Sequence, residues 1–194
     1  MYHFKKAETE AELEQVFRLN HDVFAGELRQ YNPSDERRLV DKFHEKNLYL
    51  IALEEDRVIG MLTTHDQPPF SVADRLADPA VLEPYGRIVE VRLLAILPEH
   101  RNRFVLGGLF TLLYENVHTY DSIAISGYVE QAAMYHKLGF HDLGPPVASG
   151  KAQYIPMAAT IVELRSRATV WNRTLERWMK QAAARAGTES SKED

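Results

Sequence analysis

The spacing of apolar residues predicts short strands and one amphipathic helix in the first third of the chain. Between residues 10 and 29 the apolar side chains recur mostly at helical spacing, and Thr9 with Glu12 matches a capping box at the start of this helix. Strands are predicted at residues 2–7, 48–53 and 58–64. The last two strands are joined by a short polar turn, so they are expected to pair as an antiparallel hairpin.

The rest of the chain alternates strands and helices after a proline-rich loop at residues 67–86. Such a loop is expected to pack on the surface, with pocket lining as the alternative. The most apolar strand is predicted at residues 88–97 and is stopped by Pro98. A helix, a strand, a short helix and a strand are then predicted at residues 106–119, 122–126, 131–138 and 154–164. Gly139 is placed to terminate the short helix.

No internal repeat and no linker divides the chain, which predicts one domain over residues 1–166. An amphipathic helix is expected at residues 167–186, with Trp171 and Trp178 along one side. That side either covers the sheet or forms a surface for a partner or a homodimer. Residues 187–194 are small and charged, so a disordered tail is expected.

Composition narrows the class of protein. Of the 194 residues, 45% are hydrophobic and 26% charged, as in ordinary soluble globular domains. The net charge of -5 argues against nucleic acid or an anionic membrane as a partner. The absence of cysteine excludes thiolate metal sites, and the histidines lack the spacing of a metal-dependent hydrolase, so no metal is expected. With no signal peptide and no apolar run near about 18 residues, a cytoplasmic location is expected.

The segment from residue 87 to residue 140 holds the residues that point to a chemistry. An apolar strand leads into an arginine-containing loop, then the pair Gly107-Gly108 opens a helix, and after another strand Tyr135 precedes a Gly-Phe pair. The N-terminus of a helix carries unpaired N–H donors and a partial positive charge, and glycine lets phosphate oxygens approach the backbone. The glycine pair is explained equally well by close packing of the helix.

This order of features resembles the GCN5-related N-acetyltransferase (GNAT) superfamily. The resemblance implies an α/β (α+β) fold, a single domain whose mixed, mostly antiparallel central sheet is flanked by helices, with a C-terminal helix. It also implies acetyl-CoA or another acyl-CoA as co-substrate, with pantetheine paired to the strand end and the pyrophosphate at the loop and helix start. The implied contacts are Leu94, Ala95, Ile96, Arg101, Arg103, Phe104, Val105, Leu106, Gly107 and Gly108. Because Asn102 and Phe104 stand where the family has glycines, the amides that bind the pyrophosphate stay open.

Two side chains are candidates for acid and base catalysis. Tyr135 aligns with the family's tyrosine that protonates the leaving thiolate, and its alternative is a packing role. Glu90 lies in an otherwise apolar strand, where a carboxylate is costly unless it is paired or used, and burial is expected to raise its pKa. The alternative for Glu90 is a structural ion pair with Arg92.

The N-terminal third is similar to a narrower subgroup, the acyl-homoserine-lactone synthases and the long-chain N-acyl amino acid synthases. The shared positions are Arg18, Phe24, Glu27, Leu28, Asp41, Phe43 and Glu90. His44 stands where the subgroup has a second aspartate, and Arg92 is offset by one from the subgroup's arginine. Both differences weigh against a substrate of the homoserine-lactone type.

The sequence therefore predicts an enzyme, an acyl-CoA-dependent N-acyltransferase. The expected reaction moves an acyl group, with acetyl as the first expectation, to a primary amine of a small molecule or amino acid by direct attack. Two alternatives stay open. One is a non-catalytic coenzyme A-binding sensor or partner-binding module of the same fold. The other is an enzyme whose donor is a long-chain acyl-CoA or an acyl-carrier protein.

Overall fold

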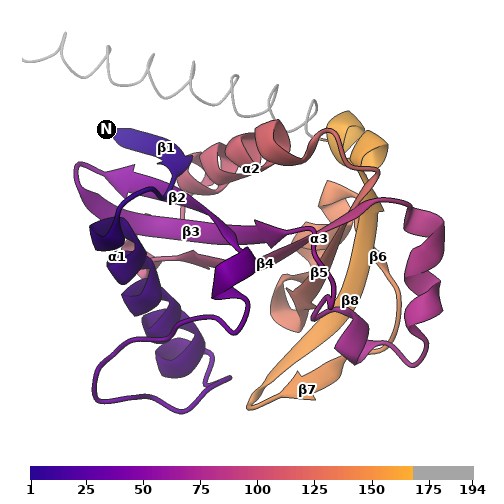
Figure 1. The fold of residues 1–194 in the computed structure, drawn as a ribbon, viewed down its shortest axis with the longest axis horizontal. Helices are drawn as coiled ribbons and strands as arrows, with labels where there is room; N and C mark the ends of the chain where they lie inside the picture. Colours follow the sequence, from indigo (N-terminus) through magenta and orange to yellow (C-terminus); the bar gives the residue numbers. More distant parts are fainter. Residues whose placement is uncertain (168–194) are drawn as a thin grey trace, which may run out of the picture.

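A single eight-stranded sheet organises the part of the chain that the computed structural model describes, residues 1–167 (Figure 1). The strand order is β1-β2-β3-β4-β5-β8-β6, with β7 paired to β8, and every pair except β4–β5 is antiparallel. The strands are β1 (Tyr2–Lys6), β2 (Leu48–Glu54), β3 (Arg57–His65), β4 (Ile88–Ile96), β5 (Ser122–Tyr128), β6 (His141–Asp142), β7 (Val147–Ser149) and β8 (Ala152–Thr160). The predicted mixed, mostly antiparallel α/β fold is confirmed.

The longer helices are α1 (Glu10–Asn20), α2 (Arg103–Val117) and α3 (Ala132–Leu138). The predicted capping box of α1 is present, since Thr9 Oγ1 accepts the N–H of Glu12 and the Glu12 carboxylate accepts that of Thr9. A π-helical segment, η1 (His21–Glu27), continues α1 directly. Short 3-10 helices are η2 (His44–Lys46), η3 (Ala73–Arg75), η4 (Pro79–Tyr85), η5 (Pro98–His100) and η6 (Val129–Gln131).

The predicted last strand, residues 154–164, is wrong at its C-terminal end. The strand β8 stops at Thr160, and residues 161–167 are helical. Thr160 and Glu163 form a reciprocal capping box at this point, because the Thr160 hydroxyl accepts the N–H of Glu163 and the Glu163 carboxylate accepts that of Thr160. The predicted helix at 167–186 and the tail at 187–194 lie, apart from residue 167, outside the described residues. The domain boundary at 166 therefore stays a prediction.

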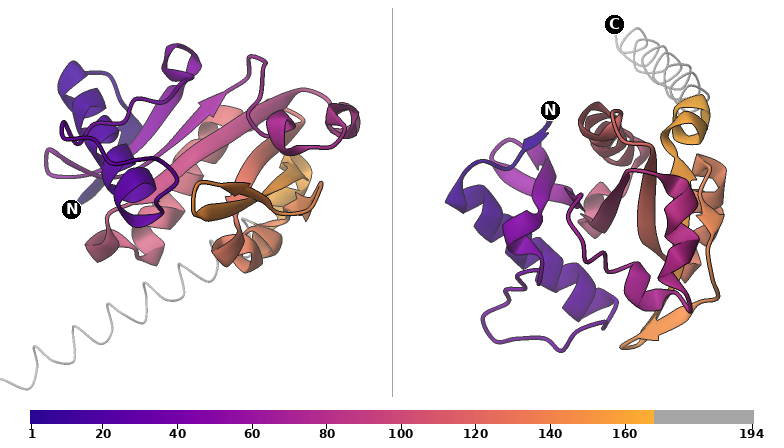
Figure 2. Two further views of the ribbon diagram at one scale, coloured as in Figure 1. Left: turned by 90° about the horizontal axis from the view of Figure 1, so that it is seen from below. Right: turned by 45° about the vertical axis from the view of Figure 1, so that its right-hand side comes forward.

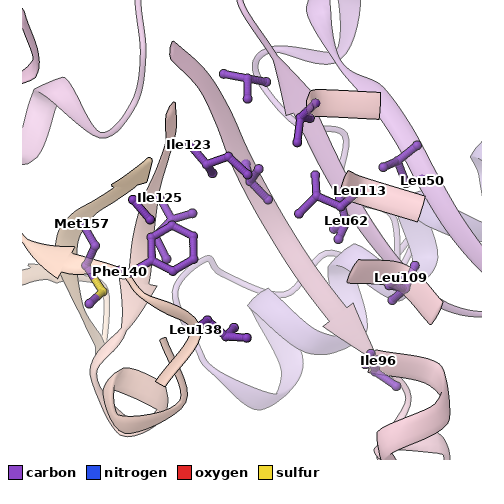
Figure 3. Packing of buried hydrophobic residues seen from close by; sticks show 14 of the residues in the cluster. Leu50, Leu62, Ile96, Leu109, Leu113, Ile123, Ile125, Leu138, Phe140 and Met157 are labelled. Carbon is purple, nitrogen blue, oxygen red and sulfur yellow. The ribbon is translucent and has the colours of Figure 1, made fainter. Parts of the chain in front are cut away.

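Helices cover both faces of the sheet (Figure 1, Figure 2). Leu50 and Ala52 of β2 belong to the core shared with α2, whereas Tyr49 and Ile51 belong to the core shared with α1 and η1. This alternation explains why β2 reads as a continuous apolar run, because both of its faces are buried. Figure 3 shows the first of these cores, with Leu109 and Leu113 of α2 beside Leu50 and Leu62 of the sheet. No helix within residues 1–167 is both long and apolar enough to cross a membrane.

The two parallel strands of the sheet separate partway along their length. β4 pairs with β5 only from Ile88 to Val91, whereas β5 stays paired with β8 as far as Tyr128. On its other side β4 carries a bulge, because Met61 is opposite Ala95 while Thr63 is opposite Arg92. Leu93, within this bulge, has a positive φ of 55°. The bulge bends β4 away from β5, and the candidate site lies in the opening.

Candidate active site

A cleft of about 480 Å³ lies where β4 and β5 diverge. Its walls come from η1 and the segment after it, the loop that holds Ser71 and Arg75, the second half of β4, the start of α2, the end of β5, α3 and β8. Ligand pockets for small molecules have volumes of about 300–1,000 Å³. The cleft is therefore large enough for a substrate, and it draws on segments that are far apart in the sequence.

The predicted pantetheine-binding residues Leu94, Ala95 and Ile96 all line this cleft. They lie beyond Val91, where β4 no longer pairs with β5. Backbone N–H and C=O groups on such a free strand edge can pair with an extended ligand that carries amides. The geometry is compatible with the predicted role, which stays a prediction.

The helix α2 begins at Arg103 and not at residue 106 as predicted. Asn102 is its N-cap, and its side-chain oxygen accepts the N–H groups of Phe104 (3.0 Å) and Val105 (3.1 Å). Gly107 and Gly108 consequently lie inside the helix, where N–H groups bond to the preceding turn and do not face a ligand. A Cβ at Gly108 would lie 2.1 Å from Cζ of Phe4 on β1. The structure therefore agrees with the alternative interpretation of Gly108, in which the glycine allows the helix to pack closely.

Arg101 and Arg103 line the cleft together with Leu106, whereas Val105 is fully buried in the core. The guanidinium of Arg101 is bidentate on the carboxylate of Glu27, with Nη1 2.7 Å from Oε1. Its Nε donates to the carbonyl of Ile96 at 2.9 Å. The ion pair with Arg101 also holds the pKa of the Glu27 carboxyl below its usual range. Arg101 thus ties η1 to the end of β4 at the point where a pyrophosphate was predicted to bind.

Tyr135 on α3 lies where the cleft meets a second cavity, because its side chain lines both. Its ring packs on Gly127 of β5, where an added Cβ would lie 2.9 Å from the ring. Burial raises the pKa of Tyr135 to about 12, outweighing a backbone hydrogen bond with Tyr128 that lowers it. The phenol therefore keeps its proton at neutral pH, as a proton donor must.

The second cavity is apolar and has a volume of about 120 Å³. It lies between α2 and the sheet and shares with the cleft the residues Val91, Arg92, Leu93, Leu94, Ser126 and Tyr135. Its remaining walls include Leu62, Phe110, Leu113, Val117, Ile123, Ile125, Leu138 and Phe140, several of which are visible in Figure 3. An apolar group that passes between β4 and β5 would enter this cavity.

Glu90 is fully buried and accepts four hydrogen bonds. Oε1 accepts from the Ser71 hydroxyl (2.7 Å) and the Val72 N–H (2.6 Å), and Oε2 accepts from the Ser71 N–H (2.8 Å) and His65 Nε2 (2.9 Å). Burial raises the pKa of Glu90, but hydrogen bonds from His65 and Ser71 outweigh it and hold the pKa below its usual value. The predicted rise in pKa is therefore wrong. Glu90 is not among the residues that line the cleft.

Arg92 connects Glu90 to a second buried carboxylate. Its Nη1 donates to Asp41 at 2.5 Å and its Nε to the Ser71 hydroxyl at 3.0 Å, while Nε is 3.9 Å from Glu90. The predicted Glu90–Arg92 ion pair exists but is long, and Asp41 is the closer partner. Ser71 was missed because the proline-rich loop was expected to be a surface loop, and His65, the last residue of β3, was not singled out in the sequence. The sequence held one signal for these hydrogen-bond donors: a lone carboxylate in an apolar strand requires donors from other parts of the chain.

Comparisons with known proteins agree with this architecture. The family model "N-acyl amino acid synthase FeeM" matches residues 15–160, and the chain belongs to this family. No curated protein matches the sequence. The predicted enzyme class, an N-acyltransferase, is thereby confirmed, as is the resemblance to the synthase subgroup.

Solved structures share the fold at low sequence identity. A CoA-dependent acyl-homoserine lactone synthase, BjaI, with SAM and isopentyl-CoA, superimposes with a TM-score of 0.68 at 22% identity over 89% of each chain. FeeM, an N-acyl amino acid synthase from uncultured soil microbes, gives 0.70 at 17% identity over 89% of this chain and 97% of its own. A putative N-acetyltransferase from Lactobacillus plantarum gives 0.60 at 15% identity over 82% of this chain and 98% of its own. These likenesses confirm a GNAT-type fold.

Proposed function

We propose that this enzyme transfers an acyl group from acyl-CoA to the primary amine of a small molecule or amino acid. One observation carries the proposal: the divergence of β4 and β5 joins a cleft of ligand size to an apolar cavity, with Tyr135 at the junction. The cleft offers a free strand edge for the pantetheine amides, and the cavity offers a place for the acyl chain. Membership of the FeeM family supports the same reaction.

The cavity favours an acyl group longer than the acetyl group expected first. Engineered apolar cavities of about 150 Å³ take up benzene, so the 120 Å³ here has room for several carbon atoms. An acetyl group would leave most of this apolar surface without a partner. BjaI, which has the same fold, was solved with isopentyl-CoA, a donor whose acyl group is also larger than acetyl.

In the proposed reaction the neutral amine attacks the thioester carbonyl. The C–N bond forms as the carbonyl oxygen takes up charge, and the proposed donors that stabilise this charge are backbone N–H groups at the β4 bulge, around Leu93. The C–S bond then breaks, Tyr135 donates its proton to the sulfur, and the proton lost by the amine passes to water and restores the phenol. Glu90 fits better as a positioning residue for Ser71 and Arg92, because all four of its hydrogen bonds are already made.

The test measures thiol release from acyl-CoA donors of increasing chain length, each with a panel of amines. Tyr135→Phe is expected to lower kcat about a hundredfold with little change in KM. The matched control is Tyr120→Phe, since the Tyr120 hydroxyl contacts Asp66 away from the cleft, and its activity is expected to stay at the wild-type level. If coenzyme A binds but no amine accelerates thiol release, the enzyme reading fails and a non-catalytic sensor is the better description.

The length preference is tested separately by reshaping the apolar cavity. Leu113→Phe is expected to shift the preferred donor to shorter chains, and Phe110→Ala to longer ones, because the first fills the cavity and the second enlarges it. Opposite shifts cannot come from a general loss of stability. If neither variant changes the preference, the acyl chain does not occupy this cavity.

A further inference from the structure

The side chain of His65 is fully buried, and both of its ring nitrogens face oxygen atoms. Nδ1 lies 3.0 Å from the carbonyl oxygen of Gln67, and Nε2 lies 2.9 Å from Oε2 of Glu90. A carbonyl oxygen can only accept a hydrogen bond, so Nδ1 must carry a proton. Whether Nε2 carries one as well depends on the state of Glu90.

The other partners of Glu90 show that its carboxyl group is ionised. The N–H groups of Ser71 and Val72 can only donate to it. The Ser71 hydroxyl accepts from Arg92 Nε, so its own proton points at Glu90. These hydrogen bonds, with that from His65, hold the pKa of Glu90 below its usual value. An ionised carboxylate has no proton to give, so His65 Nε2 must be the donor in their contact.

The surroundings of the His65 ring suit a cation. The ring is stacked on Phe70, with the centroids 5.6 Å apart, and lies tilted against Phe43 at 5.0 Å. The faces of aromatic rings attract positive charge. An imidazolium also balances the buried charge of Glu90 at closer range than Arg92 does, since Arg92 Nε lies 3.9 Å from that carboxylate. Both ring nitrogens of His65 therefore have a reason to keep their protons.

His65 is linked to the wall of the cleft through Glu90. Among the described residues, Ser71 and Arg92 line the cleft, whereas His65 and Glu90 lie behind them. Gln67 opens the loop that carries Ser71, so His65 binds both the beginning of this loop and the carboxylate that anchors it. A change at His65 is thus transmitted to two residues of the cleft without any contact between His65 and a ligand.

We infer that His65 is a positioning residue of the acyl-transfer site and that it acts as an imidazolium. Its two N–H groups hold Gln67 and Glu90. Glu90 in turn holds Ser71, and the Ser71 hydroxyl holds Arg92, at the wall of the cleft. The positioning role rests on the proposed acyl transfer, whereas the charge of His65 can be measured without any substrate.

The inference has a defined pH dependence. Loss of the proton from Nε2 would set two lone pairs against each other, so the contact with Glu90 exists at low pH and is lost as His65 gives up its proton. Two further charged groups are joined to Glu90: Arg92, which favours loss of the proton, and Asp41, which is bound to Arg92 and favours its retention. Lys46 binds a backbone carbonyl of the loop and also favours loss.

The first experiment measures the charge directly, by nitrogen NMR of the protein labelled with 15N-histidine. Signals of His65 are assigned by their absence in His65→Gln. Both ring nitrogens of the wild type are expected to show the chemical shifts of protonated nitrogens at about pH 8, where an unperturbed histidine is neutral. In Glu90→Gln, Nε2 is expected to be unprotonated at the same pH because the anion is gone. An unprotonated Nε2 in the wild type would overturn the inference.

The second experiment measures kcat/KM for acyl transfer over the same pH range. His65→Gln is expected to be about tenfold less active than the wild type at neutral pH, as for the loss of a hydrogen bond to a charged group. The two proteins should converge as the pH rises through the point at which NMR shows His65 losing its proton. The control is His118→Gln, an exposed histidine whose ring contacts the carbonyl of Glu115, and it should match the wild type at every pH.

The outcomes separate this inference from the proposed function. If the wild type acylates no amine, the proposed function fails, and NMR still decides the charge of His65. If acyl transfer occurs but the ratio of the wild type to His65→Gln is the same at every pH, His65 only supports the fold and its positioning role is overturned. If His65→Gln does not fold, the wild type carries the test, because its kcat/KM must fall at the pH where its His65 signals titrate.

Discussion

The two ends of the cleft differ in how far their polar groups are already used. At the α2 end, Arg101 is bound to Glu27 and Asn102 caps the helix with its own side chain. At the Ser71 end, the buried Glu90 behind the cleft is saturated with hydrogen bonds, whereas Arg75, which contacts the Ser71 carbonyl, has an Nε without a partner among the described residues. The α2 end carries the residues that resemble a known motif, whereas the Ser71 end comes from a loop without one. The type of a residue thus identifies it as a candidate for ligand binding. Its hydrogen bonds and ion pairs within the protein decide whether any of its polar groups stay available to a ligand.

The largest effect is expected at the saturated carboxylate. Glu90→Gln should lower the free energy of unfolding by about 3 kcal/mol, because an amide cannot accept four hydrogen bonds and leaves Arg92 with one buried carboxylate fewer. Urea denaturation at pH 7 measures this. The control Glu99→Gln changes a glutamate that pairs with Arg57 on the surface, and no measurable change is expected.

The wild type and Glu90→Gln also give a test of pH dependence. The pKa of Glu90 is lower in the folded chain than its unfolded value of about 4.3, so its contribution is complete above that pH and is lost as the pH falls towards the folded pKa. The difference between wild type and Glu90→Gln should therefore shrink on going from pH 7 to pH 3. A difference that stays constant over this range would mean that Glu90 is not ionised at neutral pH.

A smaller effect is expected at the glycine pair, where the packing role and the phosphate role predict different results. Gly108→Ala should cost about 1–3 kcal/mol in urea denaturation, because its Cβ would overlap the ring of Phe4. Phe4→Leu in the same chain should recover part of this loss. Gly26→Ala is the control, since the nearest atom to its Cβ is 3.9 Å away. Unchanged stability with a raised KM for acyl-CoA would favour the phosphate role instead.

The smallest effect is expected at the exposed pair between Glu27 and Arg101. Glu27→Gln removes the competitor for the guanidinium, so KM for acyl-CoA should fall by a factor of about 2 to 5, as for a partly exposed ion pair. Arg101→Gln should raise it. Steady-state kinetics with a saturating amine measures both. If both variants raise KM equally, Glu27 holds Arg101 in its binding position, and the two ends of the cleft differ less than proposed.

Local features were predictable because their causes lie a few residues apart. The capping box at Thr9, the β2–β3 hairpin, and the end of α3 at Gly139, which has a left-handed φ of 104°, all follow from neighbouring residues. Tyr135, which the sequence singled out as a candidate acid, lines the cleft, and its role as the acid stays a prediction. The start of α2 was misplaced because the glycine pair was given more weight than Asn102, a strong N-cap residue.

The sequence by itself determined the order of six of the eight strands and of α1, α2 and α3, the apolar β4 with a lone carboxylate in it, and the family that this order resembles. Only the tertiary structure decided which of the charged residues are satisfied. Glu90 meets donors from Ser71, and Arg92 meets Asp41 from a distant loop. Such pairings depend on how β4 bends away from β5 and on which loops fold over it. Contacts between residues far apart in the chain leave no spacing in the sequence from which they could be read.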